Sequence, residues 1–250
     1  DVAGLLMNMG SALCKQGELD RGMAKYEKAH AIFCRLYGED HVEVAAVLGN
    51  MANILGKQGR RAEAMAMEEK VLEIKRRTLG SDHDSVALTL HSLGISCMDH
   101  GMLQEALARL EEGLGIVRRL HPERNTQEAK ILHSIGGVYS RQGKLDSSLA
   151  MYKKAHRIFR KTLGSESWDV VTALGAMGLV LHKQGNVEEA TDKLNEALAI
   201  IRRTRGDEDQ NVAEFLNMVA AVRCDAGDVE GALVCWREAR SIFRKRGITG

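Results

Sequence analysis

Apolar residues return along the chain at the spacing of one helix face, and glycines interrupt the pattern at regular intervals. Between positions 45 and 55 the apolar residues stand at i, i+3, i+7 and i+10, as Ala45, Leu48, Ala52 and Leu55. Gly59 follows, and we expect it to end this helix, because the left-handed conformation that closes many helices is easiest for glycine.

A second helix is expected from about Arg60 to Thr78. Its inward face is formed by Ala64, Met67, Val71 and Ile74. Gly80 closes this helix, and a short polar loop leads into the next helical segment. The pattern therefore predicts a helix–turn–helix unit.

This unit recurs every 42 residues without an insertion. Its turn glycine stands at Gly17, Gly59, Gly101, Gly143, Gly185 and Gly227. A fixed period of this length is the signature of a repeat architecture. We expect six repeats in one domain spanning 1–250, with approximate bounds of 1–42, 43–84, 85–126, 127–168, 169–210 and 211–250.

Small residues recur in each predicted helix pair. One column contains Gly10, Ala52, Gly94, Gly136, Gly178 and Ala220, and its partner column contains Gly22, Ala64, Ala106, Ser148, Ala190 and Ala232. A glycine inside a helix costs about 1 kcal/mol relative to alanine. We therefore expect close approach of the two helices at these positions to offset that cost.

Composition supports a folded helical protein with a core of aliphatic side chains. Hydrophobic residues make up 44% of the chain, aromatic residues only 4%, and there is one proline. The formal net charge of +1 gives no overall field that would recruit nucleic acid. The five cysteines show no CxxC spacing, and we interpret them as reduced core residues of an intracellular protein.

The columns resemble the tetratricopeptide repeat, and the 42-residue period resembles the subclass found in kinesin light chains. The matching positions are the small Gly10, the turn glycine Gly17, the second-helix Ala64 and the aromatic Tyr26, Tyr152 and Trp236. The resemblance implies an all-α, right-handed α-solenoid of twelve antiparallel helices, with the first helix of each repeat on the concave face. The sequence departs from this subclass in two loops. His41 is followed by Val42 where the subclass has proline, and Pro122 stands in a column of glycines.

By this resemblance, the outward side chains of the first helices should form a groove for an extended peptide or partner segment. The predicted groove residues are Asn8, Lys15, Asn50, Asn53, Lys57, His91, His133, Arg141 and Lys183. Asparagine amides both donate and accept hydrogen bonds, and the cations would attract carboxylates of an acidic partner. The alternative is that the bases at helix C-termini simply complement the helix dipole.

Basic residues also end the second helices, at Arg35, Arg77, Arg119, Lys161, Arg203 and Lys245. They would form a ridge that could touch an acidic partner or RNA. Acidic residues in the adjacent loops include Asp40, Asp82 and Glu166, and we favour local ion pairs and dipole matching.

Two tryptophans have different expected roles. Trp168 stands in the loop before the fifth repeat, where it would either contact a partner or pack over the adjacent repeat. Trp236 stands in the inward aromatic column and is expected in the core.

No nucleotide-binding, metalloprotease or hydrolase motif is present in the sequence. We expect no catalytic residue, metal or cofactor, and a role as a protein-binding scaffold or adaptor. The alternative is a structural subunit built permanently into a large complex. We expect no nucleic-acid partner and no membrane insertion. The chain opens at Asp1 inside a helical pattern, so we expect a part of a longer protein, cytoplasmic by default with an organelle as an alternative.

Overall fold

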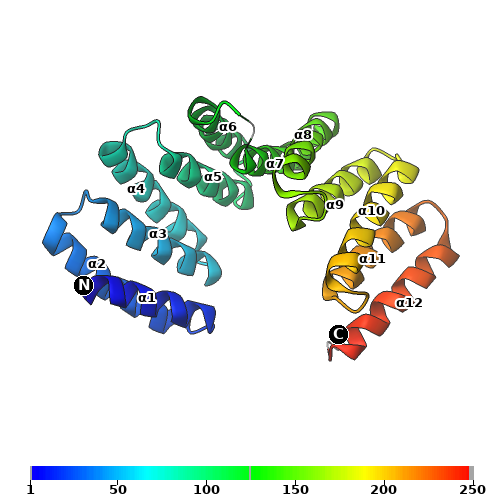
Figure 1. Ribbon diagram of the computed structural model, residues 1–250, viewed down its shortest axis with the longest axis horizontal. Coiled ribbons are helices and arrows are strands. Elements are labelled where there is room, and N and C mark those ends of the chain that lie inside the picture. Colours follow the sequence, from blue (N-terminus) through cyan, green and yellow to red (C-terminus); the bar gives the residue numbers. More distant parts are fainter. Residues whose placement is uncertain (1, 124, 248–250) are drawn as a thin grey trace. The chain divides into compact units, whose positions relative to one another are not determined.

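The structure is a computed structural model that describes residues 2–123 and 125–247. These residues form twelve α-helices and contain no β-strand (Figure 1). The helices are α1 (Val2–Lys15), α2 (Leu19–Tyr37), α3 (Val42–Lys57), α4 (Arg61–Leu79), α5 (Asp84–Asp99), α6 (Leu103–Leu120), α7 (Thr126–Arg141), α8 (Leu145–Leu163), α9 (Trp168–Lys183), α10 (Val187–Arg205), α11 (Gln210–Asp225) and α12 (Val229–Lys245). The predicted all-α architecture and its helix pairs are confirmed.

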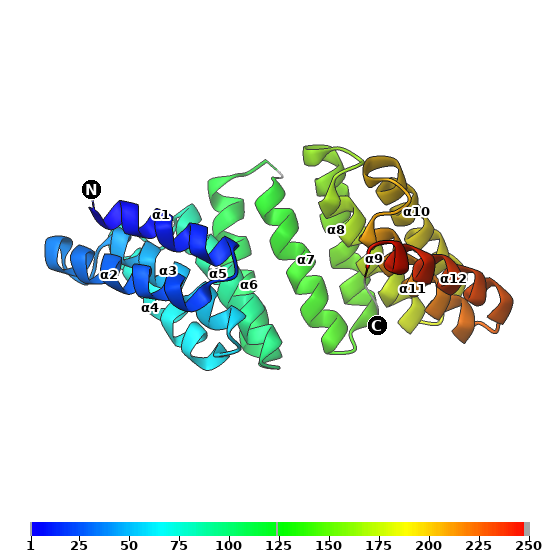
Figure 2. The same cartoon turned by 90° about the horizontal axis from the view of Figure 1, so that it is seen from below.

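The chain divides into two compact units, Asp1–Pro122 with α1–α6 and Glu123–Gly250 with α7–α12. Within each unit every helix packs on the helix before it and the helix after it. The first helices α1 and α3 lie side by side in unit 1 (Figures 1 and 2), and α9 contacts α11 in unit 2. A single domain across 1–250 stays a prediction.

The turn glycines end the first helices as expected. Gly59 has a φ of +78°, and the other five glycines of its column also have positive φ. Second helices end at another positive-φ glycine, such as Gly80 with a φ of +84°. Pro122 replaces that glycine after α6, and α6 has 18 residues where α4 has 19. Proline cannot take positive φ and disfavours helical conformation in the preceding residue, which explains the shorter helix.

The column of small residues lies where the helices of a pair meet. A Cβ atom added to Gly94 would lie 2.6 Å from Leu110, and one added to Gly136 would lie 2.9 Å from Tyr152. The Ser148 hydroxyl in the partner column donates a 2.7 Å hydrogen bond to the Gly136 carbonyl. The expected close approach is confirmed, and large side chains of the second helix fill the space that each glycine leaves.

Two expectations about the core are wrong. Trp236 is 38% exposed, whereas Tyr152 in the same column is 6% exposed. The reason is that α9 covers Tyr152 with Met177 and Val180, while no helix of the described residues follows α12. Cys224 is exposed on α11, unlike the buried Cys97 and Cys235, so the cysteines are not uniformly core residues.

Candidate functional site

The predicted site lies on the outward side of the first helices, which we call the first-helix surface. In unit 1 it comprises Asn8, Lys15, Asn50, Asn53, Lys57 and His91 on α1, α3 and α5. In unit 2 it comprises His133, Arg141 and Lys183 on α7 and α9.

In unit 1, α3 presents Asn50, Asn53 and Lys57 at i, i+3 and i+7, on one face. Asn8 and Lys15 occupy the equivalent positions of α1, 42 residues earlier. Asn50 is half-buried and the other four side chains are exposed. Among the described residues, none of these five side chains has a hydrogen-bond or ion-pair partner. Two adjacent helices thus offer free amides and ammonium groups.

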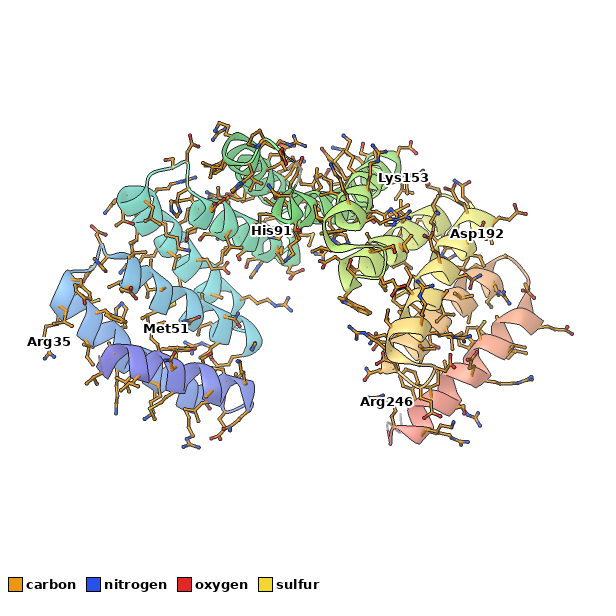
Figure 3. The ribbon with its side chains drawn as sticks, in the orientation of Figure 1. Arg35, Met51, His91, Lys153, Asp192 and Arg246 are labelled. Atoms are coloured by element: carbon orange, nitrogen blue, oxygen red, sulfur yellow. The ribbon has the colours of Figure 1, made fainter. Side chains whose placement is uncertain are left out.

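His91 lies on α5 in the next repeat (Figure 3). It is half-buried and interacts with other groups of the protein. His91 therefore belongs to the first-helix surface, and it already interacts with other groups of the protein.

His133 in unit 2 is held at the edge of the core. Its ring centroid lies 4.9 Å from that of Tyr152, with the planes tilted by 60°. Burial lowers the pKa of His133, and its buried Nε2 atom has no hydrogen-bond partner among the described residues. A neutral imidazole packed against the Tyr152 ring can support the neighbouring side chains of the first-helix surface.

Arg141 and Lys183 are exposed in the last turns of α7 and α9. Arg141 interacts with other groups of the protein, whereas Lys183 has no ion-pair partner among the described residues. Next to Lys183, the His182 Nε2 atom lies 2.9 Å from an Asp225 carboxylate oxygen on α11. This pair links two first helices across the surface of unit 2.

Trp168 is the first residue of α9, so its predicted place in a loop is wrong. Ser167 has the extended backbone of an N-cap residue, with φ −68° and ψ 151°, and helical geometry begins directly after it. The Arg205 guanidinium of α10 lies 4.3 Å from the centre of the tryptophan ring, a cation–π contact. The ring contacts α10 and still leaves 39% of the residue exposed.

Four of the six bases that end the second helices are paired, as expected. Arg77 binds Asp40 at 3.1 Å, Arg203 binds Glu166 at 2.8 Å and Lys245 binds Glu208 at 2.5 Å. In each pair the acid comes from the loop 37 residues earlier, and Arg119 binds Asp82 in the same way. Exposed pairs of this kind contribute about 0.2–1 kcal/mol each. The ridge of second-helix bases is therefore largely neutralised.

The Asp82-His83-Asp84 loop, the nearest approach to a metal-binding motif, is used for structure. The His83 Nδ1 atom accepts a 3.0 Å hydrogen bond from the Ser85 amide and caps α5. Asp82 pairs with Arg119, and Asp84 lies 2.7 Å from His121. Across residues 2–123 and 125–247, no group of His, Cys, Asp and Glu side chains is arranged to hold a metal ion.

None of the helices in the described part of the chain combines the length and the apolar character needed to cross a membrane.

Our sequence interpretation missed two polar residues on α4, Glu68 and Lys75. They stand in columns that contain apolar side chains in every other repeat, such as Leu194 and Ile201 in repeat five. Glu68 accepts a 2.8 Å hydrogen bond from the Ser96 hydroxyl of α5. Comparing each column residue by residue would have found both, because they interrupt otherwise apolar columns.

Comparison with known proteins agrees with this geometry. The sequence profile of the tetratricopeptide repeat matches residues 1–77, 127–203 and 169–245. The chain belongs to the tetratricopeptide repeat family. Its fold is an all-α repeat solenoid. Among curated protein sequences, none matches the chain.

Three solved structures show the same fold. BtubC (BKLC) from P. vanneervenii is 21% identical, with 93% of each chain covered and a TM-score of 0.80. A putative kinesin light chain of Podosopora anserina with nearly identical TPR-like repeats is 22% identical, covering 80% of this chain and 94% of that chain at a TM-score of 0.69. A Rap protein complexed with Competence and Sporulation Factor is 16% identical, covering 96% and 74% at a TM-score of 0.66. Membership of the tetratricopeptide repeat family supports a protein-interaction scaffold.

Proposed function

We propose that this protein is a non-catalytic interaction module whose first-helix surface reversibly binds an extended segment of a partner protein. One observation carries the proposal. Four of the six bases that end the second helices, Arg77, Arg119, Arg203 and Lys245, are ion-paired within the fold, whereas Lys15, Lys57 and Lys183 on the first helices have no carboxylate partner among the described residues. Cations left unpaired beside free amides suit a ligand with carboxylates and a free peptide backbone.

The strongest part of this surface lies on α1 and α3 of unit 1. An extended peptide lying across these helices would meet the amides of Asn8, Asn50 and Asn53 and the ammonium groups of Lys15 and Lys57. Amide side chains can donate hydrogen bonds to a peptide backbone and accept them from it. This contact therefore does not require a particular ligand sequence. The lysines would add a preference for acidic residues, and that preference should weaken as salt is raised.

The fold of the Rap protein complex supports this proposal by analogy, since a related solenoid was solved with a bound factor. The alternative is a structural subunit held permanently in a large assembly. Such a subunit would use wide apolar contacts instead of a polar surface, so its association would resist salt.

The first experiment is affinity purification of the protein from its source, with and without a salt wash, followed by mass spectrometry. A varied, salt-labile set of partners sharing a short acidic segment is expected. A fixed set that survives the wash would favour the assembly subunit and contradict reversible binding.

The residues are then tested with a peptide of the shared segment. The double variant Asn50→Ala/Lys57→Ala should bind this peptide about ten-fold or more weakly, since two charge-assisted or amide contacts are lost. A matched control, Lys154→Ala/Asn195→Ala, removes the same side-chain types from α8 and α10 and should bind normally. Equal binding by all three proteins would rule out the first-helix surface as the site.

A further inference from the structure

Helix α8 differs from the other second helices in the balance of its charges. It contains five Lys and Arg residues and a single acid, Asp146, whereas α10 contains four bases and four acids. Four of the α8 bases are exposed at i, i+4, i+7 and i+8, on one face of the helix. They are Lys153, Arg157, Arg160 and Lys161, and we call them the α8 basic strip (Figure 3 labels Lys153). The fifth base, Lys154, stands where Glu238 of α12 reaches back to α10, so we place it at the flank of the strip.

The strip lies on a side of the fold that remains exposed within the array of repeats. Glu73 of α4 and Ala199 of α10 are equivalents of Arg157. Both are exposed, although another repeat precedes and follows each of them. Stacking of repeats does not cover this side, so its exposure on α8 does not depend on where the sequence ends.

Lys161 lacks the acid that neutralises its equivalents. On four other second helices, the base at this position is bound by an acid 37 residues earlier, as Glu166 binds Arg203 at 2.8 Å. The residue 37 positions before Lys161 in the sequence is Arg124, a base. Lys161 has no ion-pair partner among the described residues. The sequence itself therefore removes the carboxylate from this repeat.

The acid that matches Arg160 binds another base. Arg202, the equivalent of Arg160 on α10, binds Glu238 of the next second helix at 2.6 Å. The acid 36 residues after Arg160 is Glu196, but it pairs with Lys193 of its own helix at 3.3 Å. In the described part of the chain, Arg160 has no ion-pair partner. Its guanidinium therefore stays available to a ligand.

Arg157 reverses the charge that helps to neutralise the end of α4. Its equivalent there is Glu73, which binds Arg77 one helical turn later. Lys153 has an acid nearby, and its Nζ atom lies 3.9 Å from Glu189. Like charges one turn apart destabilise a helix. Incoming carboxylates would therefore relieve this repulsion as well as form new ion pairs.

Acidic side chains border the strip. Glu189, Asp192 and Glu196 are exposed on α10, the next second helix, and Glu189 approaches Lys153. A helix with its side chains is about 10–12 Å wide, so a broader partner also meets these carboxylates. A flat anionic membrane does so, and so does a nucleic-acid duplex, whose major groove alone is about 12 Å wide. The strip therefore favours a narrow anionic chain.

The strip offers no surface for the stacking of nucleic-acid bases. The Tyr and Phe residues of α8, Tyr152 and Phe159, are 6% and 2% exposed. Proteins that bind single strands stack the bases on accessible aromatic side chains. At equivalent positions of other repeats the bases bind carboxylates, as Arg203 binds Glu166. An acidic polypeptide segment therefore fits the strip better than a nucleic-acid strand.

We propose that the α8 basic strip binds an acidic segment of a partner protein, in which several carboxylates follow one another at the spacing of the bases. That spacing is about 6 Å, because four residues of a helix rise by this distance. Acids at every second residue of an extended segment match it, since such a segment rises about 3.3 Å per residue. The first-helix surface shares no residue with the strip, so this proposal does not rest on the function proposed above.

The first test uses a fluorescent peptide of alternating glutamate and serine, about twelve residues long and thus able to span the strip. Binding is measured by anisotropy at low ionic strength, with Asn50→Ala/Lys57→Ala present in every protein so that the first-helix surface contributes little. Adding Arg157→Glu/Lys161→Glu should weaken binding about ten-fold or more. The matched control, Lys28→Glu/Arg61→Glu, changes the net charge equally at exposed bases of α2 and α4 and should bind as the parent does. Circular dichroism checks that every variant keeps its helices.

Four results of this test would overturn the proposal. They are an absence of saturable binding by the parent protein, equal weakening in the strip variant and the control, tighter binding of a single-stranded oligonucleotide that the strip variant loses, and self-association of the wild type that the strip variant abolishes in sedimentation velocity. The third would assign the strip to nucleic acid, and the fourth to a second copy of the chain.

A second measurement uses the wild type and the same peptide. A carbodiimide joins a peptide carboxylate to a lysine amine in contact with it, forming an amide while the carbodiimide takes up the water, and mass spectrometry locates the bond. Cross-links at Lys153 and Lys161 are expected. Cross-links confined to Lys15, Lys57 or Lys183 would place the peptide on the first-helix surface and contradict binding at the strip.

Discussion

Two interfaces between successive repeats have the same backbone arrangement and opposite chemistry. In unit 2, α10 packs on α11, and four apolar residues of these helices, Leu194, Ile201, Phe215 and Val222, are at most 6% exposed. In unit 1, the equivalent positions at the α4–α5 interface are Glu68, Lys75, Thr89 and Ser96. The Lys75 ammonium donates to the Thr89 hydroxyl at 2.9 Å, and the Ser96 hydroxyl donates to Glu68 at 2.8 Å.

The difference shows that the repeat geometry does not depend on an apolar pair at these positions. Burial raises the pKa of Glu68 and lowers that of Lys75, so both charged forms are disfavoured by their surroundings. Instead, Glu68 accepts from the Ser96 hydroxyl of α5, and Lys75 donates to the Thr89 hydroxyl and the Ser85 carbonyl of α5. A polar interface of this kind is less stabilising than an apolar one of the same size and more selective about its partner.

The largest expected difference comes from truncating the equivalent residues of the two interfaces. Ile201→Ala removes a side chain that is 1% exposed, and we expect the free energy of unfolding to fall by about 2–5 kcal/mol. Lys75→Ala removes a half-buried amine, and Thr89 keeps its 2.9 Å bond to the Ser85 carbonyl, so the change should stay below about 1 kcal/mol. Chemical denaturation of both variants measures the contrast, and equal losses would contradict it.

Breaking one polar pair should have an intermediate effect. Ser96→Val removes the hydroxyl that Glu68 binds, and leaving a partly buried carboxyl without its donor costs about 1–3 kcal/mol. Glu68→Leu/Ser96→Val copies the Leu194–Val222 pair of unit 2 and should recover the loss. A double-mutant cycle by denaturation measures this coupling. Additive losses would show that the pair has no selective role.

Two glycines of one column, one in each unit, should show a smaller difference in stability when each is replaced by alanine. A Cβ atom at Gly49 of α3 would meet no atom within 4 Å, whereas one at Gly175 of α9 would lie 3.0 Å from the Phe215 ring. We expect Gly49→Ala to stabilise by about 0.5–1 kcal/mol through helix propensity. Gly175→Ala should gain less or destabilise, because Phe215 must shift. Thermal unfolding of the two variants tests the order, and the reverse order would contradict the packing described.

The smallest expected effect is on the pH dependence of the two units. The pKa of Glu68 in the folded state lies above its ordinary value of 4.5, so the folded state keeps this proton to a higher pH than the unfolded state does. The free energy of unfolding therefore falls as the pH rises from 4.5 through the folded-state pKa. Burial lowers the pKa of His133 and His156 in unit 2 from 6.5, so stability there falls as pH drops below that value.

Hydrogen exchange of each helix measured against pH resolves the two trends. Glu68→Gln should flatten the dependence of α4 and α5 and leave that of α8 unchanged. An identical pH response in the wild type and this variant would show that Glu68 does not titrate in the interface.

Much of the fold followed from sequence because the period is strict. Turn glycines with positive φ, the small column and the buried apolar faces each recur six times, so one repeat confirms the next. Trp236 was misplaced because a column predicts burial only where a following helix covers it. Trp168 was misplaced by the extent of the loop alone, since Ser167 is the N-cap residue and α9 begins directly after it.

The candidate surface could be located from the sequence, but the sequence could not show which of its residues lack a partner within the protein. Side-chain spacing placed Asn50, Asn53 and Lys57 together on one face of α3. It could not reveal that His133 would pack on Tyr152 while Lys57 stayed without a partner, because both facts depend on contacts between helices. The same limitation hid the selective pairs of Glu68 and Lys75.

The Glu68–Ser96 and Lys75–Thr89 pairs have a consequence for how such a chain can be rearranged by duplication and recombination. A crossover in the loops between repeats, such as the one at Gly80, would exchange whole 42-residue units without disturbing any helix. Moving repeat three behind repeat five would set Ser96 against Leu194 and Thr89 against Ile201, and would leave the Glu68 carboxyl and the Lys75 amine facing apolar side chains. Repeats two and three would therefore have to be inherited together, as a single module of 84 residues.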